Sequence, residues 1–125
     1  MQTPIALVID DDPFMRLLAR EALEQAGLRV EEAGDGAAGL AAIQELRPDI
    51  VLLDVAMPGL DGLAVCRALR KLPGGKLIPV LMLTGLDDTN SIEQAYEAGA
   101  TDFITKPVNA AILGHRVKYI LSASK

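Results

Sequence analysis

The sequence predicts an α/β fold in which five parallel strands form one sheet with helices on both of its faces. Short apolar runs alternate with longer amphipathic segments along the chain, which is the pattern of repeated strand–helix units. Several of these runs contain no polar residue, as expected of strands buried on both faces. Helix-capping and helix-breaking residues stand at the junctions. Because strand–helix–strand crossovers are right-handed, the units build a doubly wound sheet.

The first strand and helix meet in the segment "ALVIDDDPF". Residues Ile5–Ile9 form an apolar run rich in branched side chains, which predicts a buried strand. Asp12 is placed to cap the following helix, and Pro13 takes the first helical position, where a missing N–H does no harm. The helix is expected to end near Gly27. We expect its buried face to consist of Leu17, Leu18, Ala22 and Leu23.

The second and third strands differ in polarity. Arg29–Ala33 carries several charges, which predicts an exposed strand near an edge of the sheet. Asp35 can cap a second helix that ends at Arg47 and Pro48. The inner face of that helix is expected to hold Leu40, Ile43 and Leu46. The next strand, Ile50–Leu53, is wholly apolar and is therefore predicted to be central.

The second half of the chain repeats the alternation with shorter elements. The expected elements are a helix within residues 59–72 stopped by Pro73, Gly74 and Gly75, a strand at Pro79–Leu83, a helix at Ser91–Ala98 closed by Gly99, a strand at Asp102–Ile104, and a helix from Ala110 to about Ser122. Residues 1–122 are thus expected to form one domain, with 123–125 as the start of a linker or tail.

Composition narrows the class of protein. Half of the 125 residues are hydrophobic, which predicts a folded core. The net charge of −5 argues against nucleic-acid contacts from this domain and against binding to an anionic membrane. A single cysteine excludes a disulfide framework, and no apolar run reaches membrane-spanning length. We therefore expect a cytoplasmic domain.

Polar residues follow four of the predicted strands. Asp10 and Asp11 follow the first strand, Asp54 the third, Thr84 the fourth, and Lys106 comes shortly after the fifth. In an open parallel sheet these ends meet at one edge, where ligands bind. We therefore expect the five side chains to converge.

The converging groups suit phosphoryl chemistry. Mg²⁺ prefers oxygen ligands, and Asp11, Asp54 and a backbone carbonyl after Asp54 would provide them. A carboxylate can attack phosphorus and form an aspartyl phosphate, with a lysine and a hydroxyl neutralising charge. Asp54 is the candidate nucleophile, Thr84 the donor and Lys106 the cation. The plainer alternative is that the acidic residues only cap and solvate a turn.

Four motifs carry a resemblance to a known family. The segments "LVIDDDP", "DIVLLDVAMPGLDG", "LMLTG" and "AGATDFITKPV" resemble, in order and spacing, CheY-like receiver domains of two-component response regulators. The resemblance covers essentially the whole chain. It implies a flavodoxin-like sheet with strand order 2-1-3-4-5. It also implies a signalling domain in place of an enzyme, with at most self-catalysed phosphotransfer and autodephosphorylation.

The resemblance assigns roles at the acidic edge. Asp54 would accept a phosphoryl group from the phosphohistidine of a sensor histidine kinase or a histidine phosphotransfer protein. Mg²⁺ or Mn²⁺ would be bound by Asp11, Asp54 and the backbone carbonyl of Ala56, with Asp10 acting largely through water.

The resemblance also implies a switch. Thr84 would hydrogen-bond a phosphoryl oxygen and Lys106 would pair with it, with a cis peptide bond between Lys106 and Pro107. Phe103 would swing inward behind Thr84; the plainer alternative is an ordinary core residue. Phosphorylation would thereby alter the surface of the fourth helix, fifth strand and fifth helix, which would control an output domain in cis or a protein partner.

Partner surfaces can be placed on the predicted helices. The kinase is expected to dock on the first helix, near Phe14, Met15 and Leu18. The C-terminal segment resembles a helix leading into a diguanylate cyclase or phosphodiesterase module.

A homodimer through the fourth helix, fifth strand and fifth helix is a further expectation. Glu93 and Glu97 on the fourth helix would face Arg116 and Lys118 on the fifth. The alternative is that these charges only form solvated faces.

Two other functions compete with the receiver hypothesis. Residues 34–39, "GDGAAG", match the dinucleotide-binding fingerprint, but acidic residues surround the supposed pyrophosphate site. An aspartyl-nucleophile phosphatase would carry an acid two residues after Asp54, where this chain has Ala56. The resemblance also implies that the side chains at Ala56 and Leu86 tune the dephosphorylation of Asp54. Neither side chain has a polar atom to orient an attacking water, which predicts slow hydrolysis of the phosphorylated form.

Overall fold

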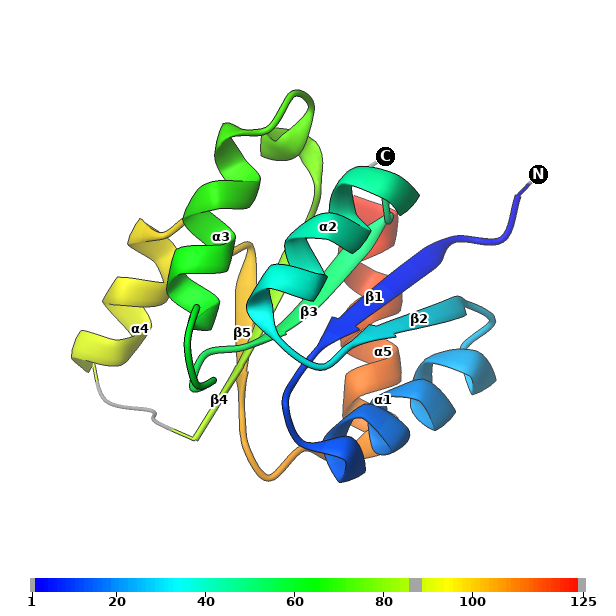
Figure 1. Cartoon of the computed structure of the whole chain (residues 1–125). Helices are drawn as coiled ribbons and strands as arrows, with labels where there is room; N and C mark the ends of the chain where they lie inside the picture. Colours follow the sequence, from blue (N-terminus) through cyan, green and yellow to red (C-terminus); the bar gives the residue numbers. More distant parts are fainter. Residues whose placement is uncertain (1, 86–88, 124–125) are drawn as a thin grey trace.

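The computed structural model describes residues 2–85 and 89–123 and shows a central sheet between two layers of helices (Figure 1). Helices α2, α3 and α4 cover one face of the sheet, and α1 and α5 cover the other. The elements in chain order are β1 (Ile5–Ile9), α1 (Pro13–Gln25), β2 (Arg29–Ala33), α2 (Gly36–Leu46), β3 (Ile50–Asp54), α3 (Gly62–Lys71), a 3₁₀ turn (Gly75–Leu77), β4 (Val80–Thr84), α4 (Thr89–Glu97), β5 (Asp102–Thr105) and α5 (Ala110–Ala123).

The sheet has the strand order β2-β1-β3-β4-β5, and all its pairings are parallel. Both β3 and β4 are buried along their whole length, whereas β2 alternates between exposed and buried positions. The predicted fold, its central third strand and its exposed second strand are therefore confirmed.

Each central strand contributes to two separate cores, because successive side chains of a strand point to opposite faces. Leu52 and Leu81 pack with α1 and α5, whereas their neighbours Leu53 and Met82 pack under α2, α3 and α4. Helices thus cover both faces of the sheet, and the ends of the strands and the loops that follow them are left to form a binding site.

Aspartates cap three of the helices, as the sequence predicts for two of them. The Asp12 carboxylate accepts the N–H of Phe14 at 2.9 Å, and the Asp35 carboxylate accepts the N–H of Ala38 at 2.8 Å. Asp61 caps α3 in the same way, so this helix begins at Gly62, three residues later than the first residue of the predicted segment. Side-chain capping of this kind satisfies N–H groups that have no partner within the helix.

The glycines of "GDGAAG" have a packing role in the structure. A Cβ on Gly39 would lie 2.6 Å from the side chain of Ile9, so only glycine lets α2 approach β1 this closely. Gly36 is similarly tight against the backbone of Leu60. Close helix–sheet packing therefore explains the small residues without a nucleotide.

The predicted inner face of α1 is wrong at one position. Leu17 is 53% exposed, and Met15 is buried in its place with Ala19 and Leu23. These buried residues follow the helical repeat of three to four, and Leu17 lies two positions from both Met15 and Ala19, on the opposite side of the helix. The other differences are shifts of element ends by one to three residues. No helix within the described residues is long and apolar enough to cross a membrane.

Candidate functional site

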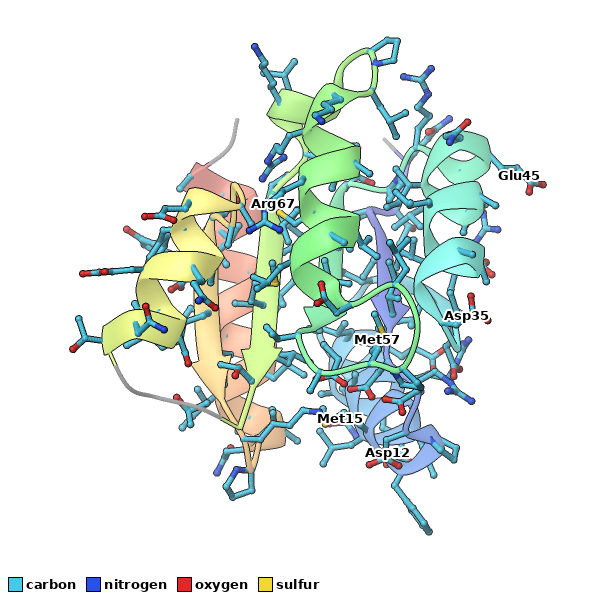
Figure 2. The ribbon with its side chains drawn as sticks, turned by 60° about the vertical axis from the view of Figure 1, so that its left-hand side comes forward. Asp12, Met15, Asp35, Glu45, Met57 and Arg67 are labelled. Carbon is cyan, nitrogen blue, oxygen red and sulfur yellow. The ribbon has the colours of Figure 1, made fainter. Side chains whose placement is uncertain are left out.

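The predicted site residues lie at the carboxyl-terminal ends of the parallel strands, here called the carboxyl edge of the sheet. Asp10 directly follows β1, Asp54 ends β3, and Thr84 ends β4. Lys106 follows β5, and its backbone N–H donates to the carbonyl of Thr84 at 2.7 Å. Figure 2 shows Asp12 and Met57 toward this end of the molecule and Glu45 toward the other. Parallel pairing places the ends of separate strands side by side, which is why residues distant in sequence meet here.

Lys106 forms ion pairs with two carboxylates at the carboxyl edge of the sheet. Its Nζ lies 3.1 Å from an oxygen of Asp54 and 3.3 Å from an oxygen of Asp10. Asp10 is 0% exposed and Asp54 is 4% exposed. Ionised groups this deeply buried need a partner of opposite charge. The predicted convergence of these three side chains is therefore present in the structure.

Burial and charge shift the ionisation of this pair. Burial raises the pKa of Asp54, and the nearby charge of Asp10 adds to the effect, against the opposing hydrogen bond from Lys106. Burial works against the charge of Lys106, but the hydrogen bond to Asp54 and the charges of both aspartates raise its pKa overall. Lys106 thus stays cationic beside two buried carboxylates that have little access to water.

The aspartates form a group with the composition of a metal site. Asp10, Asp11 and Asp54 each offer an oxygen, and these atoms all lie within 4.8 Å of one another. Lys106 contacts two of the three carboxylates and supplies one positive charge against three negative ones. A hard divalent cation such as Mg²⁺ or Mn²⁺ would balance the excess negative charge, and it prefers oxygen ligands. The donor set therefore fits the predicted cofactor.

Asp10 and Asp11 differ in how free their oxygens are. One carboxylate oxygen of Asp10 accepts a hydrogen bond from the N–H of Asp12 at 2.9 Å, and the other accepts one from Nζ of Lys106. Asp11 is exposed at the mouth of the site. The roles expected for them, Asp11 as a direct ligand and Asp10 as a ligand through water, stay predictions. Ala56 lies two residues after Asp54, and its backbone N–H works to lower the pKa of that carboxyl, against the larger effect of burial.

The predicted switch residues lie on adjacent strands. Thr84 is buried, and Phe103 is half-buried against the core under α2, α3 and α4. The ring of Phe103 meets Tyr96 of α4 edge-on, with ring centres 5.9 Å apart. The proposed movement of Phe103 stays a prediction, and Leu86 lies outside the described residues.

Two residues that shape the site were not singled out from the sequence. Gly62 begins α3 where a Cβ would collide with the backbone carbonyl of Asp54. Arg16 reaches from α1 back to the carbonyl of Asp10. The available signals were a glycine directly after the cap Asp61 and an arginine four residues after the cap Asp12.

A doubly wound sheet with buried aspartates and a lysine at its carboxyl edge defines the class of CheY-like signalling domains. The sequence profile of the response regulator receiver domain matches residues 6–118. The chain belongs to this family, as the resemblance in the sequence indicates.

Relatives and solved structures agree with this assignment. The transcriptional regulatory protein CseB of Streptomyces avermitilis is 41% identical over 115 residues, which are 92% of this chain and 48% of CseB. The DNA-binding response regulator MtrA of Mycolicibacterium smegmatis is 41% identical over 112 residues, 90% of this chain and 48% of MtrA. The chemotaxis protein CheY4 of Vibrio cholerae has a TM-score of 0.91 at 31% identity, covering 95% of this chain and 99% of CheY4.

The chain spans about half the length of the two transcriptional regulators. Their names describe transcriptional and DNA-binding proteins, and they give no support to the diguanylate cyclase or phosphodiesterase output expected from the tail. The name of MtrA also contrasts with the expected absence of nucleic-acid contacts. Because that name describes a protein about twice as long, the expectation for the shared domain stays a prediction.

Proposed function

We propose that this receiver domain accepts a phosphoryl group on Asp54 from the phosphohistidine of a sensor histidine kinase or histidine phosphotransfer protein in the cytoplasm. The observation that carries the proposal is Lys106 bound to both Asp54 and Asp10 at the carboxyl edge of the sheet. A buried carboxylate beside a fixed cation and further acidic ligands is suited to receive a phosphoryl group.

The transfer exchanges one bond to phosphorus for another. A carboxylate oxygen of Asp54 attacks the phosphorus, the nitrogen–phosphorus bond of the donor histidine breaks, and the leaving imidazole keeps the electron pair. Lys106 neutralises a phosphoryl oxygen, and the hydroxyl of Thr84 donates to another. When bound, Mg²⁺ or Mn²⁺ supplies further positive charge, and Asp11, Asp54 and the carbonyl of Ala56 would hold it, with Asp10 acting through water.

Phosphorylation would change the surface formed by α4, β5 and α5, and the output domain or partner would recognise this change. Thr84 and Phe103 would change position when the phosphoryl group is present, and the edge-on contact of Phe103 with Tyr96 links that change to α4. The output would be a DNA-binding segment in cis or a separate protein partner. The DNA-binding relatives that share this domain support the first of these.

A homodimer through the same surface is part of this proposal. Tyr96 of α4 and Ile112 and Tyr119 of α5 are exposed apolar residues that a partner could cover. Arg116 already pairs with Asp102 of its own chain at 2.8 Å, so its charge is partly used within the molecule. Lys118 is exposed but borders a hollow beside Ala22 and Gln25 of α1, so the apolar residues are the stronger support for this dimer surface.

The kinase would bind the exposed side of α1. Phe14 is 82% exposed, and Leu17 lies exposed one turn further along the helix. Met15, which the sequence prediction placed on this surface, is buried and is replaced there by Leu17.

Intact mass spectrometry after incubation with acetyl phosphate tests the acceptor. We expect a magnesium-dependent gain of one phosphate in the wild type and none in Asp54→Asn. Asp49→Asn is the matched control, because Asp49 lies at the opposite end of β3 and only accepts the N–H of Ile5 there. Equal labelling of Asp54→Asn and the wild type would contradict the proposal.

A further inference from the structure

The peptide group between Asp10 and Asp11 is held in place by an arginine from the next element. Nη1 of Arg16 donates to the backbone carbonyl of Asp10 at 2.7 Å. The N–H of Asp10 donates to the carbonyl of Ala33 at 3.1 Å. The backbone that carries the first acidic residue is therefore fixed on both sides.

This contact bears on two metal-binding residues at once. The peptide group is planar, so the carbonyl of Asp10 and the Cα of Asp11 lie in the same plane. Fixing that carbonyl therefore fixes the position of the Asp11 Cα, from which the Asp11 side chain leaves the backbone. It also sets the position of Asp10, whose carboxylate must reach Lys106.

The arginine is itself oriented by a glutamate on the neighbouring edge strand. Nε of Arg16 donates to a carboxylate oxygen of Glu32 at 3.1 Å, while its Nη1 binds Asp10. Arg20 donates to the other oxygen of Glu32 at 2.6 Å and pairs with Glu24. The guanidinium of Arg16 packs beside Gly34, where a Cβ would touch it at 3.4 Å.

We propose that Arg16, oriented by Glu32, is a positioning residue that presets the Asp10–Asp11 peptide for divalent-cation binding. This inference rests on the proposed metal site. It assigns a role to a residue that does not touch the metal, the phosphoryl group or Asp54. Residues that orient metal ligands commonly change metal affinity by about 10- to 100-fold when they are replaced.

Electrostatics and positioning predict opposite results for the same substitution. Arg16→Gln removes a positive charge near a cation site, which by itself would tighten Mg²⁺ binding. Loss of the held peptide would weaken it. The sign of the change in affinity therefore distinguishes the two explanations.

Arg20→Gln is the matched control. Arg20 lies one helical turn after Arg16 and binds the same Glu32. Within residues 2–85 and 89–123 the guanidinium of Arg20 binds only Glu32 and Glu24. The two variants lose the same charge from the same ion-pair network, but only Arg16→Gln loses the contact with Asp10.

The experiment is a Mg²⁺ titration followed by the amide NMR signals of residues 10–12 and 54–56, in the full chain without phosphodonor. We expect the dissociation constant to rise about tenfold in Arg16→Gln and to change less than about twofold in Arg20→Gln. Arg16→Lys should recover only part of the loss, because a lysine cannot bind Glu32 and the Asp10 carbonyl with one planar group.

The outcomes separate this proposal from the proposed function. Unchanged or tighter Mg²⁺ binding by Arg16→Gln, beside normal binding by the wild type, would overturn the positioning role and leave the metal site intact. Absence of Mg²⁺ binding by the wild type would overturn the metal site and the positioning role with it. Equal weakening in both variants, with equal loss of thermal stability, would show a general structural effect and would also overturn the proposal.

Discussion

Arg70 and Lys106 are basic residues at opposite ends of the sheet, and they bind different kinds of acceptor. Arg70, whose helix α3 leads to the amino end of β4, donates to the carbonyls of Gly75 and Ile78 at 2.6 Å and twice to that of Gly99. Lys106 at the carboxyl end faces the carboxylates of Asp54 and Asp10. The arginine satisfies neutral backbone acceptors, whereas the lysine sits among buried charges.

The distribution of buried polar groups follows the same division. Within the described part of the chain, the buried polar or charged side chains are Asp10, Asp54 and Thr84, all of them at the carboxyl end. Desolvated charges are costly, and an opposite charge offsets this only in part. One end of the sheet therefore holds loops together, while the other keeps buried charged groups close to one another at a cost in stability.

The largest expected effect on stability is at the amino end. Arg70→Met leaves three backbone carbonyls without their partner, and we expect the free energy of unfolding to fall by about 3 kcal/mol. Urea unfolding followed by circular dichroism measures it. The control is Arg67→Met on the same helix, where Arg67 is exposed (Figure 2) and a change within about 0.5 kcal/mol is expected. Equal losses in both variants would remove the proposed role of the Arg70 hydrogen bonds.

The second expected effect is on the lifetime of the phosphoryl group. Ala56 lies exposed beside Asp54 and has no polar side-chain atom to orient a water. We expect slow hydrolysis in the wild type and about tenfold faster hydrolysis in Ala56→Asn, because an amide can hold the attacking water in line. The decay of the phosphorylated mass in magnesium buffer provides the rate. A wild-type half-life of only seconds would contradict this expectation.

A smaller effect is expected from neutralising Asp54. Asp54→Asn removes a desolvated charge, so without divalent cations the free energy of unfolding should increase by about 1 kcal/mol at neutral pH. Asp49→Asn removes an exposed charge and should change it by less than about 0.5 kcal/mol. Urea unfolding in a chelating buffer measures both. A loss of stability in Asp54→Asn would mean that its pairing with Lys106 outweighs the desolvation of the carboxylate.

The smallest expected effect depends on pH and lies at the edge strand. The hydrogen bond from Arg20, against the opposing effect of burial, lowers the pKa of Glu32 below its ordinary 4.5. A lowered pKa means that the stabilisation is complete above pH 4.5 and is lost as the pH falls through the pKa of the folded state. Glu32→Gln should therefore cost less than about 1 kcal/mol at pH 7 and nothing at low pH. Unfolding curves across this range would reveal a constant difference if the ionisation of Glu32 were irrelevant.

Much of the fold follows from the local sequence. The apolar run Ile50–Leu53 predicts a central strand, and the caps Asp12 and Asp35 predict where two helices begin, because these signals depend on near neighbours. Side-chain direction within α1 was harder to predict. Leu17 and Met15 are both apolar, and only the packing of the helix on the sheet decides which of them is buried.

The acidic site was predictable because the topology of a parallel sheet places the ends of its strands together. The contacts of Arg16 and Arg70 were not, since long side chains can reach backbone carbonyls in many places and composition does not select one. The hydrogen bonds from Arg70 to Gly99 and Ile78 depend on how separate loops meet. For Arg16, the distance of four residues from the cap Asp12 suggests that the side chain lies near the site, but it does not select the carbonyl that the side chain binds.

The edge-on contact between Tyr96 and Phe103 gives this domain a built-in optical reporter. The chain has no tryptophan and two tyrosines, so its ultraviolet fluorescence comes from Tyr96 and Tyr119. Tyr119 is exposed and lies on the outer surface of α5, whereas Tyr96 touches the ring expected to move. Replacing Tyr119 by phenylalanine would leave a single emitting group at the junction of α4 and β5. The arrival of a phosphoryl group could then be followed in real time without any attached dye.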